Sequence, residues 1–235
     1  MASIYDYERP FVCTDVVVFR IATQEADSYR KLPETKLSVL LYNRPCEPFI
    51  GKWCIPGGFL NIDEIPEDNV KRKLSEKSGD IECYLEQLYT FSDIARDSRG
   101  RVISITYLGL ITESEVQVDG EWFIVNVGND NQITFQKGDI ELTQADLGFD
   151  HYNIIQTALE RLRGKLGYTD IVFHLLPEEF TLTQLQNVYE TVMGKKEVAA
   201  NFRRKIAPMV VETDRYTSDK GHRPAKIFIK KVEGN

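Results

Sequence analysis

Two apolar stretches near the beginning of the chain have the pattern of buried strands. Val12 to Arg20 reads VCTDVVVFR and Lys36 to Tyr42 reads KLSVLLY, and short apolar runs rich in β-branched residues predict strands. The polar segment Ala22 to Thr35, which contains Pro33, predicts a loop between them. Further strands are predicted at Trp53 to Phe59, Leu85 to Phe91, Val102 to Ile111 and Glu121 to Asn126.

Two segments between and after these strands have the signals of helices. Pro66 to Ser78 begins with a proline and two acidic residues and is followed by Gly79, and such residues are favoured at the two ends of a helix. Asp150 to Leu166 carries apolar residues at helical spacing, and its stripe consists of Tyr152, Ile155, Leu159 and Leu162. Each segment therefore predicts a helix.

A different pattern begins at Leu175. Pro177 to Met193 predicts a helix that Thr181 or Thr183 caps and that Gly194 ends, with a stripe of Leu182, Leu185, Val188, Tyr189 and Val192.

The remaining residues predict a basic helix and a strand. Glu197 to Val210 predicts a second helix whose inward side chains are Val198, Phe202, Ile206 and Met209. Thr213 to Pro224 is polar and predicts a loop, and Ala225 to Lys231 alternates apolar and basic residues as an edge strand does. Helix, turn, basic helix, loop and strand is the order of a winged helix-turn-helix.

Charge is distributed unevenly along the chain. The net charge is −7, but Lys195 to Lys231 holds 11 Lys and Arg against 4 Asp and Glu, which is +7, and the rest carries −14. An acidic body joined to a basic segment is expected where one domain contacts phosphate and the other does not. Charge alone favours the alternative, a solvated basic face.

Composition favours a soluble cytoplasmic protein. Of the residues, 42% are hydrophobic and 28% charged, no apolar run approaches the roughly 18 residues that span a bilayer, and Met1 to Pro10 does not have the pattern of a signal peptide. The four cysteines, which form no C-x-x-C pair, are expected to be reduced thiols; they are Cys13, Cys46, Cys54 and Cys83.

The most specific motif lies between Gly58 and Asp80, which reads GFLNIDEIPEDNVKRKLSEKSGD. It resembles the Nudix box, whose family pattern is G-x5-E-x7-R-E-U-x-E-E-x-G-U with U an aliphatic residue. The matching positions are Gly58, Glu64, Arg72, Leu74, Glu76 and Gly79. The spacing is maintained over more than twenty residues, so the resemblance implies a Nudix-type fold.

The departures from this pattern bear on activity. The family places glutamates on one face of the box helix, where they hold Mg²⁺, a cation that needs oxygen ligands. Here two of the three glutamates are Lys73 and Lys77, only Glu76 remains, and Asp80 stands at the final aliphatic position unless Ile81 fills it. Ammonium groups repel a divalent cation, so we predict no enzyme, no catalytic residue, no metal site and no cofactor. Both lysines are candidates either for phosphate contact or for a solvated helix face.

Nearly the whole chain resembles the Nudix-related transcription regulators, in which a Nudix-like sensor precedes a winged helix. The residues that carry the likeness are Gly57 to Phe59, Tyr84 to Ile111, Leu147 to His151, Leu175 to Gly194 and Asn201 to Ile206. The resemblance implies an α/β fold, a Nudix-type α-β-α sandwich over residues 1–166 and a winged helix-turn-helix over 167–235. It also implies a homodimeric bacterial repressor that binds double-stranded operator DNA and responds to ADP-ribose or to a sugar.

The ligand pocket is expected over the strand ends of the first domain. Arg44 and Arg101 would bind a phosphate or a sugar hydroxyl, and Trp53 and Phe59 would stack on a base or cover a sugar ring, although Trp53 is also a candidate for the core. The predicted ligand-binding residues are Arg44, Trp53, Gly58, Phe59, Glu64, Arg99 and Arg101.

The DNA-binding surface is expected on the second helix of the winged helix motif, which enters the major groove. Arg203 and Arg204 are the best candidates because a guanidinium presents a bidentate donor pair. The predicted set also includes the turn before that helix and the tip of the wing, and it comprises Lys195, Lys196, Asn201, Arg203, Arg204, Lys205, Lys220, His222 and Arg223.

Two other functions compete with this interpretation. A weak Mg²⁺-dependent hydrolase of ADP-ribose-type nucleoside diphosphates would have to use Glu64 and Glu76 for its metal. An adaptor whose winged helix binds protein would have no salt-dependent affinity for DNA. Turnover of ADP-ribose with Mg²⁺ identifies the first, and the salt dependence of DNA binding separates the second.

Overall fold

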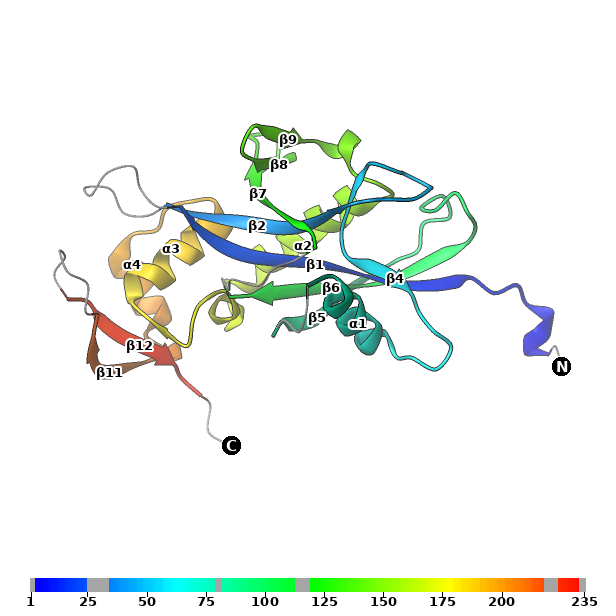
Figure 1. Ribbon diagram of the computed structural model, residues 1–235. Coiled ribbons are helices and arrows are strands. Elements are labelled where there is room, and N and C mark those ends of the chain that lie inside the picture. The colour runs from blue at the N-terminus through cyan, green and yellow to red at the C-terminus, as the bar shows by residue number, and fades with distance from the viewer. Residues whose placement is uncertain (1–2, 25–33, 79–81, 113–118, 218–223, 233–235) are drawn as a thin grey trace. The chain divides into compact units, whose positions relative to one another are not determined.

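A computed structural model of the protein describes residues 3–24, 34–78, 82–112, 119–217 and 224–232. Figure 1 follows the chain from the N-terminus in blue to the C-terminal strands in red. The described residues divide into two compact units, of which the first comprises Met1–Phe19, Ser38–Leu110 and Glu115–Leu159 and the second Arg20–Leu37, Ile111–Ser114 and Glu160–Asn235. Within the described residues, no helix is long and apolar enough to cross a membrane.

A sheet of nine strands, counted over the described residues, dominates the fold. Its strands are β1 (Phe11–Gln24), β2 (Glu34–Asn43), β3 (Trp53–Cys54), β4 (Gly57–Phe59), β5 (Tyr84–Phe91), β6 (Val102–Ile111), β7 (Glu121–Val127), β8 (Ile133–Lys137) and β9 (Ile140–Leu142). The order is β5-β6-β1-β2-β7-β8-β9, with β3 paired to β2 and β4 paired to β1. The predicted Trp53 to Phe59 strand is therefore two short strands, and β8 and β9 were not predicted from the sequence.

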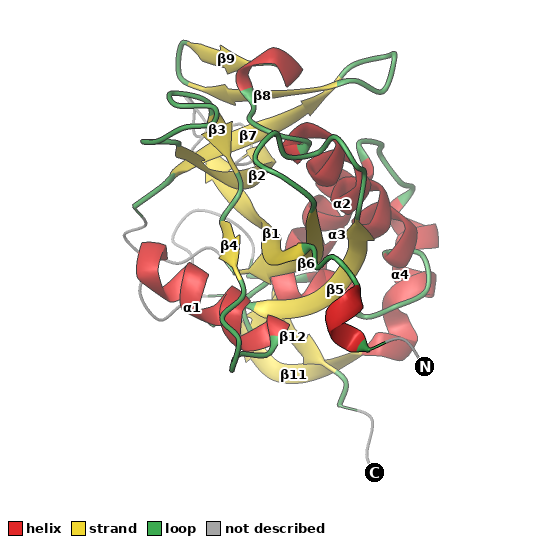
Figure 2. Cartoon of the chain, turned by 90° about the vertical axis from the view of Figure 1, so that its right-hand side faces the viewer, coloured by secondary structure: helices red, strands yellow, loops and turns green. Residues whose placement is uncertain are grey.

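Helices lie on both sides of this sheet. Figure 2 shows α1 (Pro66–Ser78) on one side of β1 and β6 and α2 (His151–Lys165) on the other. The predicted stripe of α2 is buried, since Ile155 and Leu162 are completely covered and Leu159 is 2% exposed. Short 3-10 helices complete the chain at Ile4–Asp6, Gln144–Asp146, Ile171–Leu175 and Ala207–Met209. Helices on both faces of a sheet confirm the predicted α-β-α sandwich.

The C-terminal elements form a winged helix. They are β10 (Glu179–Phe180), α3 (Leu182–Met193), α4 (Ala199–Ile206), β11 (Val210–Tyr216) and β12 (Lys226–Lys230), and the three strands pair in the order β10-β12-β11. Thr181 caps α3, because its side chain accepts from the Gln184 amide at 3.2 Å. Gly194 ends α3 with φ of 68°, a left-handed conformation that favours glycine. The ring of the completely buried Phe202 in α4 lies 5.4 Å from the ring of Tyr189 in α3, and this contact joins the two helices.

Three details of the predicted winged helix were wrong. The first helix begins at Leu182 rather than Pro177, because Glu179–Phe180 pairs with β12. The second helix covers only Ala199–Ile206, and Val198 is 65% exposed because it lies outside that helix as its N-cap. The beginning of the predicted loop at Thr213 is a strand, because β11 extends through Tyr216 along β12.

Candidate functional site

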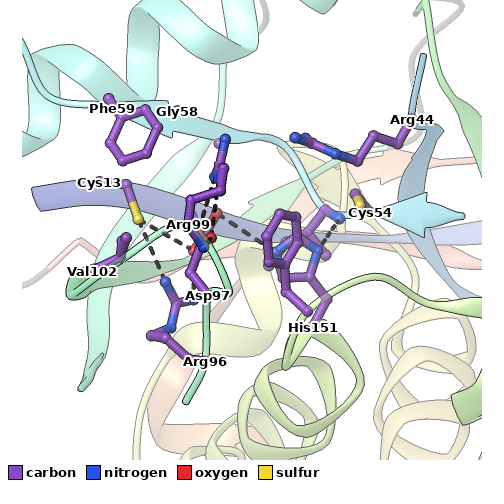
Figure 3. Close-up of a pocket in the computed structure, with 14 residues that line it drawn as sticks. Cys13, Arg44, Cys54, Gly58, Phe59, Arg96, Asp97, Arg99, Val102 and His151 are labelled. Atoms are coloured by element: carbon purple, nitrogen blue, oxygen red, sulfur yellow. Dashed lines mark hydrogen bonds and ion pairs between the residues drawn. The ribbon is translucent and has the colours of Figure 1, made fainter. Parts of the chain in front are cut away.

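A pocket of ≈ 210 Å³ opens beside β1 and β4 in the first unit. Figure 3 shows its side chains, which converge from strands, from the segment after β5 and from the start of α2. It is lined by Cys13, Asp15, Arg44, Cys54, Ile55, Gly57, Gly58, Phe59, Arg96, Asp97, Arg99, Val102, Phe149 and His151. We call it the first pocket. Its combination of aromatic rings, guanidinium groups and covered polar atoms is suited to a polar small molecule with a ring.

Two arginines and two aromatic rings shape the mouth of the first pocket. The Arg99 guanidinium lies 5.2 Å from the ring centre of Phe59 and 5.7 Å from that of Phe149. The Arg44 guanidinium lies 5.0 Å from the centre of Phe149. Asp97 anchors Arg99 through hydrogen bonds of 3.0 and 2.7 Å. Cations held over ring faces in this way are attracted to the rings and are fixed in orientation.

A buried ion network forms the floor of the first pocket. The Arg96 side chain, 3% exposed, donates to Asp150 at 2.8 and 3.0 Å and to Asp15 at 3.3 Å. Ser104 donates its hydroxyl to Asp15 at 2.6 Å. The network satisfies the charge that burial would otherwise leave unpaired, and removal of one member of such a pair typically costs about 3–5 kcal/mol.

The buried cysteines of the first pocket are not nucleophiles. Burial raises the pKa of Cys13 to about 12 and the pKa of Cys54 to about 11, so both remain thiols at neutral pH. All four cysteines are free, in agreement with the expectation of reduced thiols. Their contribution to the first pocket is therefore an apolar wall rather than covalent chemistry.

His151 is held neutral at the base of the first pocket. Its side chain is 6% exposed, and its Nδ1 accepts a hydrogen bond from the backbone amide of Ile55 at 3.2 Å. Burial lowers the pKa of His151, while Asp15, whose Oδ1 lies 3.9 Å from Nε2, opposes that shift. Because Nδ1 already accepts the Ile55 amide, the neutral imidazole carries its proton on Nε2 and can donate a hydrogen bond to a ligand without adding charge.

A second pocket of ≈ 410 Å³ adjoins the first and shares Arg44, Cys54, Ile55 and Gly57 with it. It is lined in addition by Tyr42, Asn43, Pro45, Trp53, Pro56, Lys73, Glu76, Asp119, Gly120 and Glu121. This second pocket therefore brings the box helix α1 to the same hollow as the end of β2.

The carboxylates that remain in the box are engaged by neighbouring cations. Arg72 donates to Glu64 at 2.7 and 2.8 Å and to Glu76 at 2.8 Å. Lys73 donates to the other oxygen of Glu76 at 2.8 Å. Hydrogen bonds from Arg72 and Asn69 lower the pKa of Glu64 to about 2. Both carboxylates are thus ionised but bound to side chains of the same domain.

This donor set does not fit the magnesium ion that the Nudix fold implies. Mg²⁺ requires near-octahedral oxygen ligands, whereas Lys73 places an ammonium against Glu76. Among the residues that the structure describes, no group of three His, Cys, Asp or Glu side chains is arranged to hold a metal. The side chain of Lys77 lies outside the described part of the chain.

The structure brings some of the predicted ligand-binding residues together and separates others. Arg44, Gly58, Phe59 and Arg99 line the first pocket. Trp53 lines the second pocket and packs edge-on against Phe123 at 4.8 Å, so it belongs to the core and to a pocket wall at once.

Two predicted residues line neither pocket. Glu64 is bound to Arg72, and Arg101 donates to the backbone carbonyls of Ser92 and Asp93 at 2.7 and 3.0 Å. These hydrogen bonds hold the Arg101 guanidinium at the carbonyls that follow β5. Arg101 therefore stabilises its own loop and does not line the pocket.

Several pocket residues were not predicted from the sequence. Phe149 and His151 were noted only as part of a family-like segment, and Arg96 and Asp97 only as part of a loop. The available signal was their position directly after β5 or at the start of α2, where strand ends and helix starts converge on a binding site.

The helix α4 presents a basic surface in the second unit. Asn201, Arg203, Arg204 and Lys205 are all exposed, whereas Phe202 and Ile206 face the core. The Arg204 guanidinium donates to Asn201 at 3.2 Å. Within the described residues, neither Arg203 nor Arg204 forms an ion pair with a carboxylate, so both are available to an external anion.

Lys205 is placed differently from the two arginines. Its ammonium donates to the hydroxyl of Tyr189 at 2.6 Å and lies 4.3 Å from the centre of that ring. This contact ties Lys205 to α3 beside the exposed face of α4. The predicted wing residues Lys220, His222 and Arg223 lie outside the described residues.

A buried carboxylate organises the turn between α3 and α4. Glu190, which is 7% exposed, accepts from the Glu197 amide at 3.0 Å, from Gln186 at 2.8 Å and from Lys196 at 2.8 Å. Burial by itself would raise the pKa of Glu190, but these donors outweigh it and hold the pKa below its usual value. Lys196 therefore stabilises the turn, while Lys195 is exposed.

Comparison with known proteins finds both domains. The NUDIX domain family matches residues 29–140, and the NrtR DNA-binding winged helix domain matches residues 172–229. An ADP-ribose pyrophosphatase from Methanocaldococcus jannaschii is 30% identical over 48% of this chain and 69% of its own length. The chain is similar to a MutT/nudix family protein from Enterococcus faecalis, with a TM-score of 0.78, 27% identity and coverage of 98% and 94%.

Two relatives match along nearly the whole chain. The ADPR responsive transcriptional repressor NtrR of Acinetobacter baylyi is 31% identical over 95% of this chain and 83% of its own length. Shewanella oneidensis NrtR, solved in complex with a 27mer DNA, superimposes with a TM-score of 0.69 and 31% identity over 94% of this chain and 93% of that one. The chain is thus homologous to an ADP-ribose-responsive repressor in both of its domains, and it belongs to the NrtR family of Nudix-related transcriptional regulators.

Proposed function

We propose that this protein is a transcriptional repressor whose winged helix binds operator DNA and whose Nudix domain binds a small effector without hydrolysing it. The observation that carries the proposal is the exposed basic face of α4, on which Arg203 and Arg204 have no carboxylate partner among the described residues. We place the DNA-binding part in residues 167–235 and the effector-binding part in 1–166. The protein acts in the cytoplasm as a homodimer.

The chemistry of α4 supports DNA rather than protein as the partner. Exposed arginines on the second helix of a winged helix reach guanine edges and phosphates in the major groove. Phe202 and Ile206 face the core, so α4 turns its charged residues outward and keeps its largest apolar ones inside. A surface of this composition matches a phosphate backbone.

The effector is ADP-ribose or a chemically related molecule. The named function of the Acinetobacter baylyi relative is a response to ADPR. The first pocket offers Phe59 and Phe149 for a ring and Arg44 and Arg99 for polar groups. A free sugar fits the same donors and is the second effector class to test.

Hydrolysis is not part of the proposal. Glu76, the carboxylate that remains among the three glutamate positions of the box, is bound by Arg72 and Lys73, and an ammonium occupies the place of a metal-ligating oxygen. A control assay of ADP-ribose turnover with Mg²⁺ is therefore expected to show none, and turnover that a Glu76→Gln variant abolishes would establish the hydrolase instead.

The decisive experiment is fluorescence anisotropy of a labelled duplex from the protein's own upstream region, titrated at physiological salt. The wild type is expected to bind this duplex tightly and a scrambled duplex weakly. Arg203→Ala combined with Arg204→Ala removes two charged side chains from the groove. Removal of one base-reading arginine typically costs about 1–3 kcal/mol, so specific binding is expected to disappear. The circular dichroism spectrum is expected to stay unchanged, since both side chains are exposed.

Arg9→Ala combined with Lys71→Ala is the matched control, because it removes the same charge from exposed positions of the first unit. This control is expected to bind like the wild type. Unchanged affinity in the Arg203 and Arg204 double variant would refute the placement of the recognition helix. Addition of ADP-ribose, or separately of pentoses, to the same complex then identifies the effector by the change in anisotropy.

A further inference from the structure

Lys73 is a well-anchored cation in the box helix. Its side chain is 24% exposed, and its aliphatic stem lies against Gly58. A Cβ at Gly58 would lie 2.5 Å from Lys73 Cε and 3.0 Å from Cδ, so a side chain at this position would have to displace the end of Lys73. The stem of Lys73 therefore lies beside strand β4, while its ammonium donates to Glu76 at 2.8 Å.

Lys73 and Arg44 line the same second pocket. The Nε of Arg44 donates to the carbonyl of Pro48 at 2.5 Å, which holds the guanidinium in place. The three carboxylates that line this pocket already have partners. Glu76 pairs with both Arg72 and Lys73 at 2.8 Å, Glu121 pairs with Lys137 at 2.6 Å, and Asp119 also interacts with another group.

We infer that Lys73 takes the place of the divalent cation, so that a diphosphate group binds in the second pocket to Lys73 and Arg44 without any metal. The inference rests on the proposed function, because it assigns the phosphate-binding part of the effector site. A lysine ammonium is a compact charge with three donors, and it binds phosphate as a point charge. When Lys73 turns to phosphate, Glu76 keeps Arg72 as its partner.

The continuity of the two pockets indicates the class of ligand. Arg44, Cys54, Ile55 and Gly57 line both, so one molecule can place a diphosphate in the second pocket and a ring next to Phe59 and Phe149 in the first. A ring-bearing diphosphate such as a nucleoside diphosphate sugar has this composition. A free pentose would occupy the first pocket alone and would not depend on Lys73.

The test is isothermal titration of the full chain with ADP-ribose, once with EDTA and once with millimolar Mg²⁺. The wild type is expected to bind equally well in both buffers. Lys73→Ala is expected to weaken binding at least about tenfold in both, the size of a lost charge-assisted hydrogen bond. Lys73→Glu restores a carboxylate next to Glu76, so its affinity is expected to be low in EDTA and to recover partly with Mg²⁺.

Lys71→Ala and Lys71→Glu are the matched controls, because Lys71 is exposed on the same helix and lines neither pocket. They are expected to bind like the wild type, and thermal melts show whether each variant is folded. A wild type that needs Mg²⁺, or a Lys73→Ala variant with unchanged affinity, overturns the inference. Binding of a pentose without binding of ADP-ribose also overturns it, while the separate DNA titration would still establish the repressor.

Discussion

At the scale of single residues, burial decides which groups of the Nudix domain are charged. His151 and Arg96 both approach Asp15, yet burial and hydrogen bonding affect them differently. Arg96 remains charged because two carboxylates face it, at 2.8 and 3.3 Å. His151 remains neutral because it is buried and its Nδ1 accepts the Ile55 amide. Asp15 therefore forms an ion pair with Arg96, which is always charged, and not with His151, which is neutral.

Neutral His151 makes the stability of the protein depend on pH. The pKa of His151 is lowered in the folded state by burial, whereas an unfolded histidine has a pKa of about 6.5. The unfolded chain binds the proton first, so the free energy of unfolding is expected to fall as pH decreases below about 6.5. Urea unfolding at pH 7.5, 6.5 and 5.5 measures this slope.

His151→Asn provides the comparison, since an amide oxygen can accept the Ile55 amide but does not titrate. Its unfolding free energy is expected to change less between pH 7.5 and 5.5 than that of the wild type. Equal slopes in the two proteins would mean that another group is responsible.

At the scale of elements, the turn between α3 and α4 positions α4, the helix that we propose binds DNA. Glu190 is a buried polar group near the end of α3, and it accepts the backbone amide of Glu197 two residues before α4 begins. Gln186, which donates to the same Glu190 oxygen, also donates to the Glu197 carbonyl at 3.0 Å. The direction of α4 thus depends on hydrogen bonds made by α3 rather than on the turn residues alone.

Glu190→Ala is expected to weaken DNA binding, although Glu190 is not among the residues that we propose contact DNA. The change leaves the Glu197 amide and Lys196 without their acceptor, and an unsatisfied buried donor costs about 1–3 kcal/mol. Urea unfolding is expected to show that loss of stability, and anisotropy is expected to show reduced affinity for the operator. Thr181→Ala serves as a comparison, because it removes the cap of α3, costs about 1 kcal/mol and leaves the turn intact. Equal DNA affinities for the two variants would contradict a positioning role of Glu190.

At the scale of the whole molecule, the uneven distribution of charge determines which part of the protein attracts DNA. The acidic part of the chain carries −14 and the basic C-terminal segment +7, so a duplex is attracted to one region and repelled by most of the rest. A single α4 of eight residues reads only a short stretch of groove. Two copies joined in one dimer double that stretch and add their phosphate contacts.

The dimer is therefore expected in solution and on DNA. Sedimentation equilibrium is expected to give about twice the chain mass of 27.0 kDa, and anisotropy at high duplex concentration is expected to saturate at two chains per palindromic duplex. A duplex with one half-site is expected to bind much more weakly. A monomer at micromolar concentration that binds both duplexes equally would exclude this arrangement.

The sequence by itself determined the features that depend on neighbouring residues. The box helix was predicted with its observed bounds, Pro66–Ser78, and β6 with its bounds, Val102–Ile111. Periodicity and end signals are local, so they are visible in one segment at a time. The replacement of box glutamates by Lys73 and Lys77 was equally visible, because it needs only the spacing of the motif. The family and the α-β-α fold were implied by the resemblance of these segments to the Nudix-related regulators.

Only the tertiary structure decided which distant residues meet. Arg96 pairs with Asp15, which is 81 positions away in the sequence, and with Asp150, which is 54 positions away. No local sequence pattern predicts such pairs. Arg101 was expected in the pocket but binds carbonyls of its own loop, and Thr213 was expected in a loop but lies in β11 because β12 pairs with it. Contacts of this kind join segments that are far apart in the sequence. The pattern of one segment therefore cannot show how much they stabilise the fold.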